Sequence, residues 1–246
     1  MRIAVVGGTG LIGAHAVQLA RAAGHDVLVL ARSTGCDVYD GAGLDLSGVE
    51  AVIDVVDPGN EYERVTFFEL ASRHLQSAAQ AGGVRHYVLL STIGAAAHPY
   101  GRFAGKAVQE HCLAEGKIPW TILPTAPSYE FAEQHGKTIG GWVFVPQVLA
   151  QPLPARAIAE RLLWAAESVP VGYAREFSGP DRLRLAEITR MVFQAREDPR
   201  PVIELPYWGR YGKSLRDGTL LPQENAEIGT VGYVNWLAEY SQLHRH

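Results

Sequence analysis

An α/β fold, with a doubly wound parallel sheet and helices on both faces, is predicted by three features of the sequence. Short apolar runs alternate with longer stretches of helical spacing. A glycine cluster follows the first apolar run and precedes the first helical stretch. The chain has 246 residues, 47% of them hydrophobic and 20% charged, which suits one large α/β domain with a small additional region.

The first half of the chain is expected to supply the sheet and its helices. Its predicted strands are Ile3–Val6, Asp26–Ala31, a short strand at Val38–Tyr39, Ala51–Val56, His86–Leu90 and Trp120–Leu123. Its predicted helices are Leu11–Ala23, Glu61–Ala81 and Arg102–Glu115. Glycines end the last two helices, and Pro124 is expected to break the last strand. In such a sheet, ligands collect at the carboxyl ends of the strands.

The pattern loosens after Ser128. The predicted strands there are Trp142–Val145, Glu176–Phe177 and Val202–Leu205. The predicted helices are Phe131–His135, Arg156–Glu167, Leu185–Gln194 and Tyr233–Tyr240, and a lid or packed loop is expected over Tyr207–Asn225. We therefore expect a core of residues 1–128 and a smaller α/β region of residues 129–246, interleaved with the core in one compact unit.

Glycines at positions 7, 10 and 13 predict a dinucleotide site. Gly7 permits a sharp turn, Gly10 permits close approach of a pyrophosphate, and Gly13 permits close helix–strand packing. The N–H groups at the helix start, with the positive end of the helix dipole, favour phosphate. The predicted contacts are Gly7, Thr9, Gly10, Leu11, Ile12 and Gly13. The alternative is a purely structural turn.

The end of the second strand favours NADP(H) over NAD. A carboxylate that would bind a ribose 2′-hydroxyl is missing there, and Ala31-Arg32-Ser33 stands in its place. The guanidinium of Arg32, with Ser33, suits a 2′-phosphate, although a solvated surface arginine is the alternative. The other strand ends add Val56 and Asp57 on the adenosine side, Ser91 and Thr92, and Pro124 and Thr125 to the predicted cofactor site.

Four features together carry a family resemblance. They are the Gly7-x-x-Gly10-x-x-Gly13 spacing, Ser91-Thr92-Ile93-Gly94, Lys106, and Pro119-Trp120-Thr121-Ile122-Leu123. With them the chain resembles the NmrA-like, atypical branch of the short-chain dehydrogenases/reductases. The resemblance implies a Rossmann domain, a smaller C-terminal substrate region and NADP(H). Members of that branch range from reductases to cofactor-binding regulators without activity.

The resemblance also implies a catalytic Ser, Tyr and Lys, with the Tyr four residues before the Lys on one helix face. Lys106 matches the lysine, and Ser91 lies close to the serine, but Arg102 occupies the tyrosine position. An arginine is no proton donor at pH 7. The candidate catalytic residues are therefore Lys106, Tyr100 and Ser91. Alternatively, Lys106 is a surface charge paired with Glu110, and the Ser91 hydroxyl caps backbone groups.

Three arrangements remain open for the missing tyrosine. Tyr100, Tyr129 or His98 donates the proton; the acceptor is an iminium or enone that needs little acid help; or no hydride transfer occurs. Side chains that would line an apolar substrate pocket are Tyr129, Phe131, Trp142, Tyr207 and Trp208, unless they only fill the core.

The function expected from these features is NADPH-dependent reduction of a small apolar or aromatic carbonyl, enone or imine. The alternatives are a redox-sensing regulator that binds NADP(H) without turnover, or a lyase, isomerase or cyclase on the same fold.

Bulk properties exclude several other classes. A net charge of −4 with a pI near 6.1 offers no basic field for nucleic acid or anionic lipid. Two cysteines and no signal-like or spanning segment predict a cytoplasmic protein. The His and Cys spacings predict no metal site. The expected partner is a small-molecule substrate, with a homodimer or a protein partner left open.

Overall fold

The computed structural model describes residues 1–58, 63–130 and 136–243. The chain forms two compact units, one of residues 1–124 and 156–175, the other of residues 125–155 and 176–246. The division therefore falls a few residues before the expected boundary at residue 128, and residues 156–175 return to the first unit.

The first unit holds the sheet that the sequence predicts. Its strands are β1 (Arg2–Val6), β2 (Asp26–Leu30), β3 (Ala51–Asp54), β4 (His86–Thr92), β5 (Trp120–Thr125) and β9 (Gly172–Tyr173). The strand order is β5-β4-β3-β1-β2, with β9 beside β5, and β1 pairs in parallel with β2 and β3. Val6 lies opposite both Leu30 and Asp54, so three strands end side by side.

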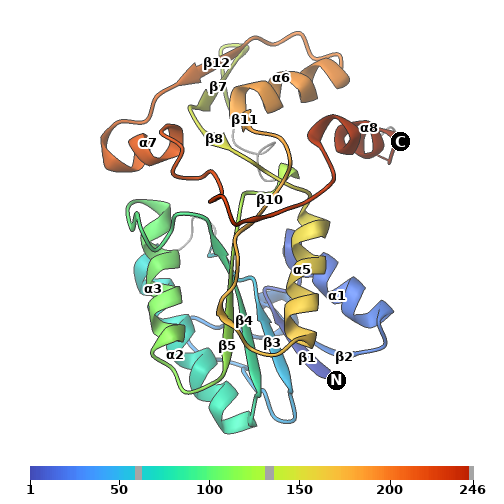
Figure 1. The fold of residues 1–246 in the computed structure, drawn as a ribbon, viewed down its shortest axis with the longest axis vertical. Helices are drawn as coiled ribbons and strands as arrows, with labels where there is room; N and C mark the ends of the chain where they lie inside the picture. The colour runs from blue at the N-terminus through green and yellow to red at the C-terminus, as the bar shows by residue number, and fades with distance from the viewer. Residues whose placement is uncertain (59–62, 131–135, 244–246) are drawn as a thin grey trace. The chain divides into compact units, whose positions relative to one another are not determined.

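Helices cover both faces of this sheet (Figure 1). They are α1 (Leu11–Ala22), α2 (Arg64–Gly82), α3 (Arg102–Ala114) and α5 (Ala155–Glu167). In Figure 1, α1 and α5 lie on one face and α2 and α3 on the other. Phe67, Phe68 and Leu75 of α2 are buried in one hydrophobic core with Tyr87 and Leu89 of β4. The α/β fold with a parallel central sheet is thereby confirmed.

The second unit contains a smaller sheet of order β12-β7-β6, and α6 packs against β7 and β12. Its strands are β6 (Lys137–Ile139), β7 (Trp142–Pro146), β8 (Leu149–Ala150), β10 (Phe177–Ser178), β11 (Leu183–Arg184), β12 (Val202–Leu205) and β13 (Glu227–Ile228). Its helices are α6 (Leu185–Ala195), α7 (Gly209–Arg216) and α8 (Tyr233–Leu243). The core gathers Val143, Val145, Ile188 and Val202 with Tyr129.

Two expectations about strands are wrong. Val38 and Tyr39 lie in a turn, not a strand, because the carboxylates of Asp37 and Asp40 accept backbone N–H groups two residues on. Pro124 does not break β5, which runs on to Thr125. The proline, which has no N–H to donate, lies between the residues of β5 that pair with β9 and the one that pairs with β10.

The stretch Tyr207–Asn225 is not all loop, since it contains α7. The short helix expected at Phe131–His135 lies outside the described residues.

Candidate functional site

The glycine turn begins directly after β1. Gly7 has a φ of 78°, which residues with a side chain rarely adopt, and its N–H donates to the Leu30 carbonyl at 2.8 Å. A Cβ on Gly13 would lie 2.1 Å from the Gly7 carbonyl oxygen. The backbone geometry itself therefore requires glycine at positions 7 and 13.

Helix α1 presents its first turn without a side-chain cap from any described residue. Its N-cap is Gly10, and Thr9, Gly10 and Leu11 are exposed. The first N–H groups of a helix have no intrahelical acceptor, and the helix dipole makes this end positive. The turn thus offers backbone donors of the kind that phosphate oxygens accept.

The end of β2 lies beside the same turn. Arg32 and Ser33 form a short 3₁₀ turn that runs from Arg32 to Thr34. The Ser33 hydroxyl donates to Thr9 Oγ1 at 3.4 Å, and the Ala31 N–H donates to Thr34 Oγ1 at 3.0 Å. Residues expected at the pyrophosphate and at the 2′-phosphate are thus neighbours.

The chain after β3 also reaches the glycine turn. The Val55 N–H donates to the Val6 carbonyl at 3.0 Å, and a Cβ on Gly7 would lie 3.1 Å from Val56 Cα. Asp57 forms a bidentate ion pair with Arg64 of α2, with N–O distances of 2.7 and 3.1 Å. Val56 therefore lies against the glycine turn, while the Asp57 carboxylate is already paired within the protein.

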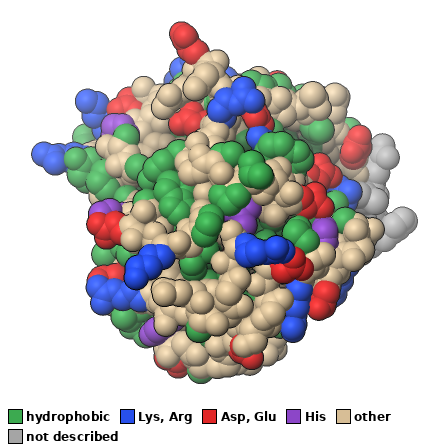
Figure 2. All heavy atoms as spheres, turned by 60° about the horizontal axis from the view of Figure 1, so that its bottom comes forward, with side chains coloured by type: hydrophobic (Ala, Val, Ile, Leu, Met, Phe, Trp, Pro, Cys, Tyr) green, Lys and Arg blue, Asp and Glu red, His purple; other side chains and the backbone are tan. Residues whose placement is uncertain are grey.

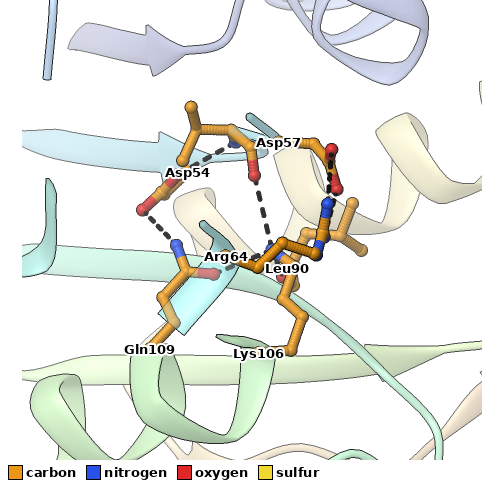
Figure 3. Close-up of polar contacts among 7 residues, drawn as sticks. Asp54, Asp57, Arg64, Leu90, Lys106 and Gln109 are labelled. Carbon is orange, nitrogen blue, oxygen red and sulfur yellow. Dashed lines mark hydrogen bonds and ion pairs between the residues drawn. The ribbon is translucent and has the colours of Figure 1, made fainter. Parts of the chain in front are cut away.

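Lys106 is buried, not a surface charge, and Figure 3 shows its polar contacts. Its Nζ donates to Gln109 Oε1 at 2.8 Å, to the Leu90 carbonyl at 3.0 Å and to the Val56 carbonyl at 3.5 Å. The same Nζ lies 4.8 Å from the centroid of the Phe68 ring. The ammonium is thus held at the carboxyl ends of β3 and β4.

Asp54 and Gln109 belong to this cluster, and the sequence analysis missed both. Asp54 Oδ2 accepts from the Tyr87 hydroxyl at 2.7 Å and from Gln109 Nε2 at 2.9 Å, and Asp54 Oδ1 accepts from the Val56 N–H at 3.0 Å. The available signal was an acidic residue inside an otherwise apolar predicted strand. A buried carboxylate needs such partners.

Burial and charge act in opposite directions on this cluster. Burial lowers the pKa of Lys106, and the nearby Asp54 carboxylate opposes that change. Burial raises the pKa of Asp54, against the Lys106 charge and hydrogen bonds from Tyr87, Val56 and Gln109. Burial, together with the Asp54 charge, raises the pKa of Tyr87. Each charge therefore makes the burial of the other less costly.

Ser91 is also buried, and its hydroxyl donates to Glu110 of α3. The alternative interpretation, in which Lys106 pairs with Glu110 on the surface, is wrong, because both side chains are buried. The Ser91 hydroxyl thus has a carboxylate of α3 as an acceptor. Thr92, the last residue of β4, is half-buried.

Glu110 gives the stability of the protein a testable pH dependence. Burial raises its pKa above 4.5, so the folded state binds this proton over a pH range where the unfolded state does not. The stabilisation is complete below about pH 4.5 and is lost as pH rises through the higher folded pKa.

We expect Glu110→Gln to match the wild type at pH 4 and to be more stable at pH 8, by about 1.4 kcal/mol for each unit of the pKa shift. The glutamine keeps an acceptor for Ser91. Urea unfolding between pH 4 and pH 8 measures the difference in stability between variant and wild type, with Glu224→Gln, at an exposed position, as control. A difference between variant and wild type that is independent of pH would contradict the expectation.

The loop before α3 holds the other proton-donor candidates. Tyr100 is 37% exposed, and its N–H donates to the His98 carbonyl at 2.6 Å. Arg102 is the first residue of α3, one helical turn before Lys106. Tyr100 is thus near the start of the helix that carries Lys106, outside the buried cluster.

The predicted substrate residues belong to the second unit. Tyr129 is fully buried among Tyr233 and Trp236, and its hydroxyl donates to the Val231 carbonyl at 3.0 Å. Burial raises its pKa. Trp142 is 49% and Trp208 is 86% exposed, whereas Phe131 lies outside the described residues. Tyr129 therefore lies in the core of the second unit.

Three further findings concern the last predicted cofactor contacts, metal ligands and membrane-spanning helices. Pro124 is half-buried and Thr125 is buried, at the end of β5. Among the described residues, no three His, Cys, Asp or Glu side chains are placed to hold a metal ion. Within the same ranges, no helix is long and apolar enough to cross a membrane.

Comparison with known proteins adds structural relatives only. No protein-family model and no curated protein matches the chain. A UDP-N-acetylglucosamine 4-epimerase from Bacillus cereus is similar, with a TM-score of 0.67, 19% identity and full coverage of both chains. The chain shares the α/β Rossmann-like fold of this structure.

Two other solved structures agree with that fold. The NAD-dependent NDP-hexosamine 5,6-dehydratase TunA has a TM-score of 0.71 at 15% identity, over 98% of this chain and 96% of that one. A short-chain dehydrogenase/reductase superfamily protein from Agrobacterium tumefaciens, with bound NAD, has a TM-score of 0.69 at 14% identity, over 100% and 97%. At these identities the likeness extends to the fold alone.

Proposed function

We propose that the protein binds NADP(H) at the glycine turn. We further propose that it is an NmrA-like reductase, transferring a hydride to a small apolar or aromatic carbonyl, enone or imine. One observation carries the proposal: the ends of β1, β2 and β3 meet at a glycine turn beside the uncapped start of α1. When bound, the nicotinamide supplies the hydride.

Different observations support the proposal of a nicotinamide dinucleotide and the proposal that it carries a 2′-phosphate. Similar folds were solved with NAD bound, which favours a nicotinamide dinucleotide. The choice of NADP(H) rests on Arg32 and Ser33, since residues 31–33 include no carboxylate to bind a ribose 2′-hydroxyl. A guanidinium and a hydroxyl suit a phosphate.

Replacing Arg32 by alanine is expected to weaken NADPH binding about 10- to 100-fold and to leave NADH binding unchanged. Charge-assisted hydrogen bonds to one phosphate are worth about 1.5–3 kcal/mol. Calorimetric titration of both cofactors measures this, with the exposed Arg21→Ala on α1 as control. Equal affinity of the variant and the wild type for NADPH would contradict the 2′-phosphate assignment.

The proposed reduction has to proceed without the usual tyrosine. Lys106, through its ammonium, contacts the nicotinamide ribose in this proposal, and Tyr100 is the phenol nearest in sequence to that helix start. The Ser91 hydroxyl, the third candidate catalytic group, donates to Glu110. An iminium or enone acceptor fits best, because it needs the least acid help.

A second candidate function is a redox-sensing regulator that binds NADP(H) without turnover. It is favoured by Ser91 and Lys106, whose polar atoms are both held by partners within the protein. Such a protein would bind NADPH yet consume none across a broad carbonyl and imine panel. Rapid NADPH consumption with any one acceptor would remove this candidate.

A third candidate, a reaction without net redox change, is favoured by the epimerase and the dehydratase among the similar structures. It predicts product formation with no change in nicotinamide absorbance. Mass spectrometry of the same panel separates it from the other two.

A further inference from the structure

A chain of three polar side chains links β3 to Lys106 across the buried side of α3 (Figure 3). Gln109 Nε2 donates to Asp54 Oδ2 at 2.9 Å, and Gln109 Oε1 accepts from Lys106 Nζ at 2.8 Å. All three side chains are more than nine-tenths buried. An amide thus bridges a carboxylate and an ammonium that lie in the protein interior.

The charges at its two ends fix the orientation of this amide. The N–H group of Gln109 points to the carboxylate and its oxygen points to the ammonium. The reverse orientation would set the amide oxygen against the carboxylate and the N–H group against the ammonium. Asp54 is held further by the Tyr87 hydroxyl and the Val56 N–H. Lys106 Nζ faces three acceptors, the Gln109 amide oxygen and the carbonyls of Leu90 and Val56, which suits the three N–H groups of an ammonium; Asp54 accepts three hydrogen bonds, which suits a carboxylate.

The bridge places the ammonium beside the glycine turn. Lys106 Nζ donates to the carbonyls of Leu90 and Val56. The Val56 Cα is the atom nearest to a Cβ built on Gly7, at 3.1 Å. One residue thus separates the ammonium from the turn.

We propose that Asp54 and Gln109 are positioning residues, which keep the Lys106 ammonium charged and fixed beside the glycine turn for contact with the nicotinamide ribose. The ribose contact rests on the proposed function, but the charge and the place of Lys106 do not. The other groups that act on this charge are Asp57, Arg64 and Glu110. They pair among themselves or with Ser91, so Asp54 is the carboxylate bridged to Lys106.

The titration of Lys106 tests the positioning role without any cofactor. The chain has four lysines, Lys106, Lys117, Lys137 and Lys213, so ¹³C-labelled lysine gives few NMR signals to follow against pH. Asp54→Asn is expected to lower the titration midpoint of Lys106 by about one pH unit or more, because burial persists while the opposite charge is gone. Tyr87→Phe, which removes one hydrogen bond to the same carboxylate, is the matched control and should leave the midpoint nearly unchanged.

An unshifted midpoint in Asp54→Asn, or an equal shift in both variants, would overturn the proposal. Gln109→Met, similar in size, cuts the bridge and keeps both charges. If Asp54→Asn does not fold, a lowered midpoint in Gln109→Met supports the proposal, and an unchanged one overturns it.

NADPH titration from pH 7 to pH 10 tests the contact with the ribose. As pH rises, the affinity of each protein for NADPH is expected to fall at least tenfold. Asp54→Asn should lose this affinity at a lower pH than the wild type does, while Tyr87→Phe should follow the wild type. A lowered Lys106 midpoint with the same pH profile of binding would overturn the ribose contact. Absence of dinucleotide binding by the wild type would instead refute the proposed function, and the NMR result would stand by itself.

Discussion

Gly13→Ala is expected to abolish dinucleotide binding and to destabilise the fold by about 3 kcal/mol. The new methyl group would lie 2.1 Å from the Gly7 carbonyl oxygen and 2.8 Å from both the Gly7 carbonyl carbon and the Gly8 Cα. All of these are backbone atoms, so no side chain can rotate away. Either the turn or α1 must shift, and the N–H groups at the start of α1 shift with it.

Urea unfolding and NADPH calorimetry measure the two effects of Gly13→Ala. Ala14→Gly is the control, since it alters the next residue of the same helix, which is exposed, and costs only about 1 kcal/mol of helix propensity. A Gly13→Ala protein that binds NADPH as the wild type does would show that the turn is merely structural.

Lys106→Met is expected to cost about 3–5 kcal/mol of stability at neutral pH. The substitution leaves the buried Asp54 carboxylate without its cation, and Gln109 Oε1 without its donor. The stability that Lys106→Met loses relative to the wild type depends on pH. Without the cation, the folded pKa of Asp54 rises further above 3.8, so the protonated form stabilises the variant below about pH 3.8 and that contribution is lost as pH rises through the folded value.

Unfolding of Lys106→Met at pH 4 and pH 8 is expected to show the larger deficit at pH 8. The double variant Asp54→Asn/Lys106→Met should recover part of the loss at pH 8, because no unpaired charge remains. Additive effects of the two substitutions would contradict the coupling between these side chains.

The glycine turn and the strands around it were predictable from the sequence because their signals are local. Gly7, Gly10 and Gly13 lie within one turn and helix start, and the strands before and after them are short apolar runs. The closeness of Ser33 to Thr9 follows from two adjacent parallel strands that end level.

The Lys106 cluster was only half predictable, because its partners come from separate elements. Spacing along one helix singled out Lys106, whereas Asp54 lies 52 positions earlier in β3 and pairs through Gln109. Burial of a lysine depends on those partners, which no local pattern reveals.

Two elements were misjudged because side chains and packing outweigh local propensity. Val38 and Tyr39 are apolar and aromatic, as strands prefer, but the flanking aspartates cap a turn. Helix α7 contains Gly209 and Gly212, poor helix formers, yet a Cβ on Gly212 would lie 1.9 Å from the Tyr207 carbonyl oxygen. Close packing explains the second glycine.

A crystal structure of the protein with NADPH tests the central claim most directly. We predict the pyrophosphate on the N–H groups at the start of α1, next to Gly10, and the 2′-phosphate at Arg32 and Ser33. A cofactor bound elsewhere on the chain, or crystals grown in saturating NADPH with the glycine turn closed by side chains, would contradict the account.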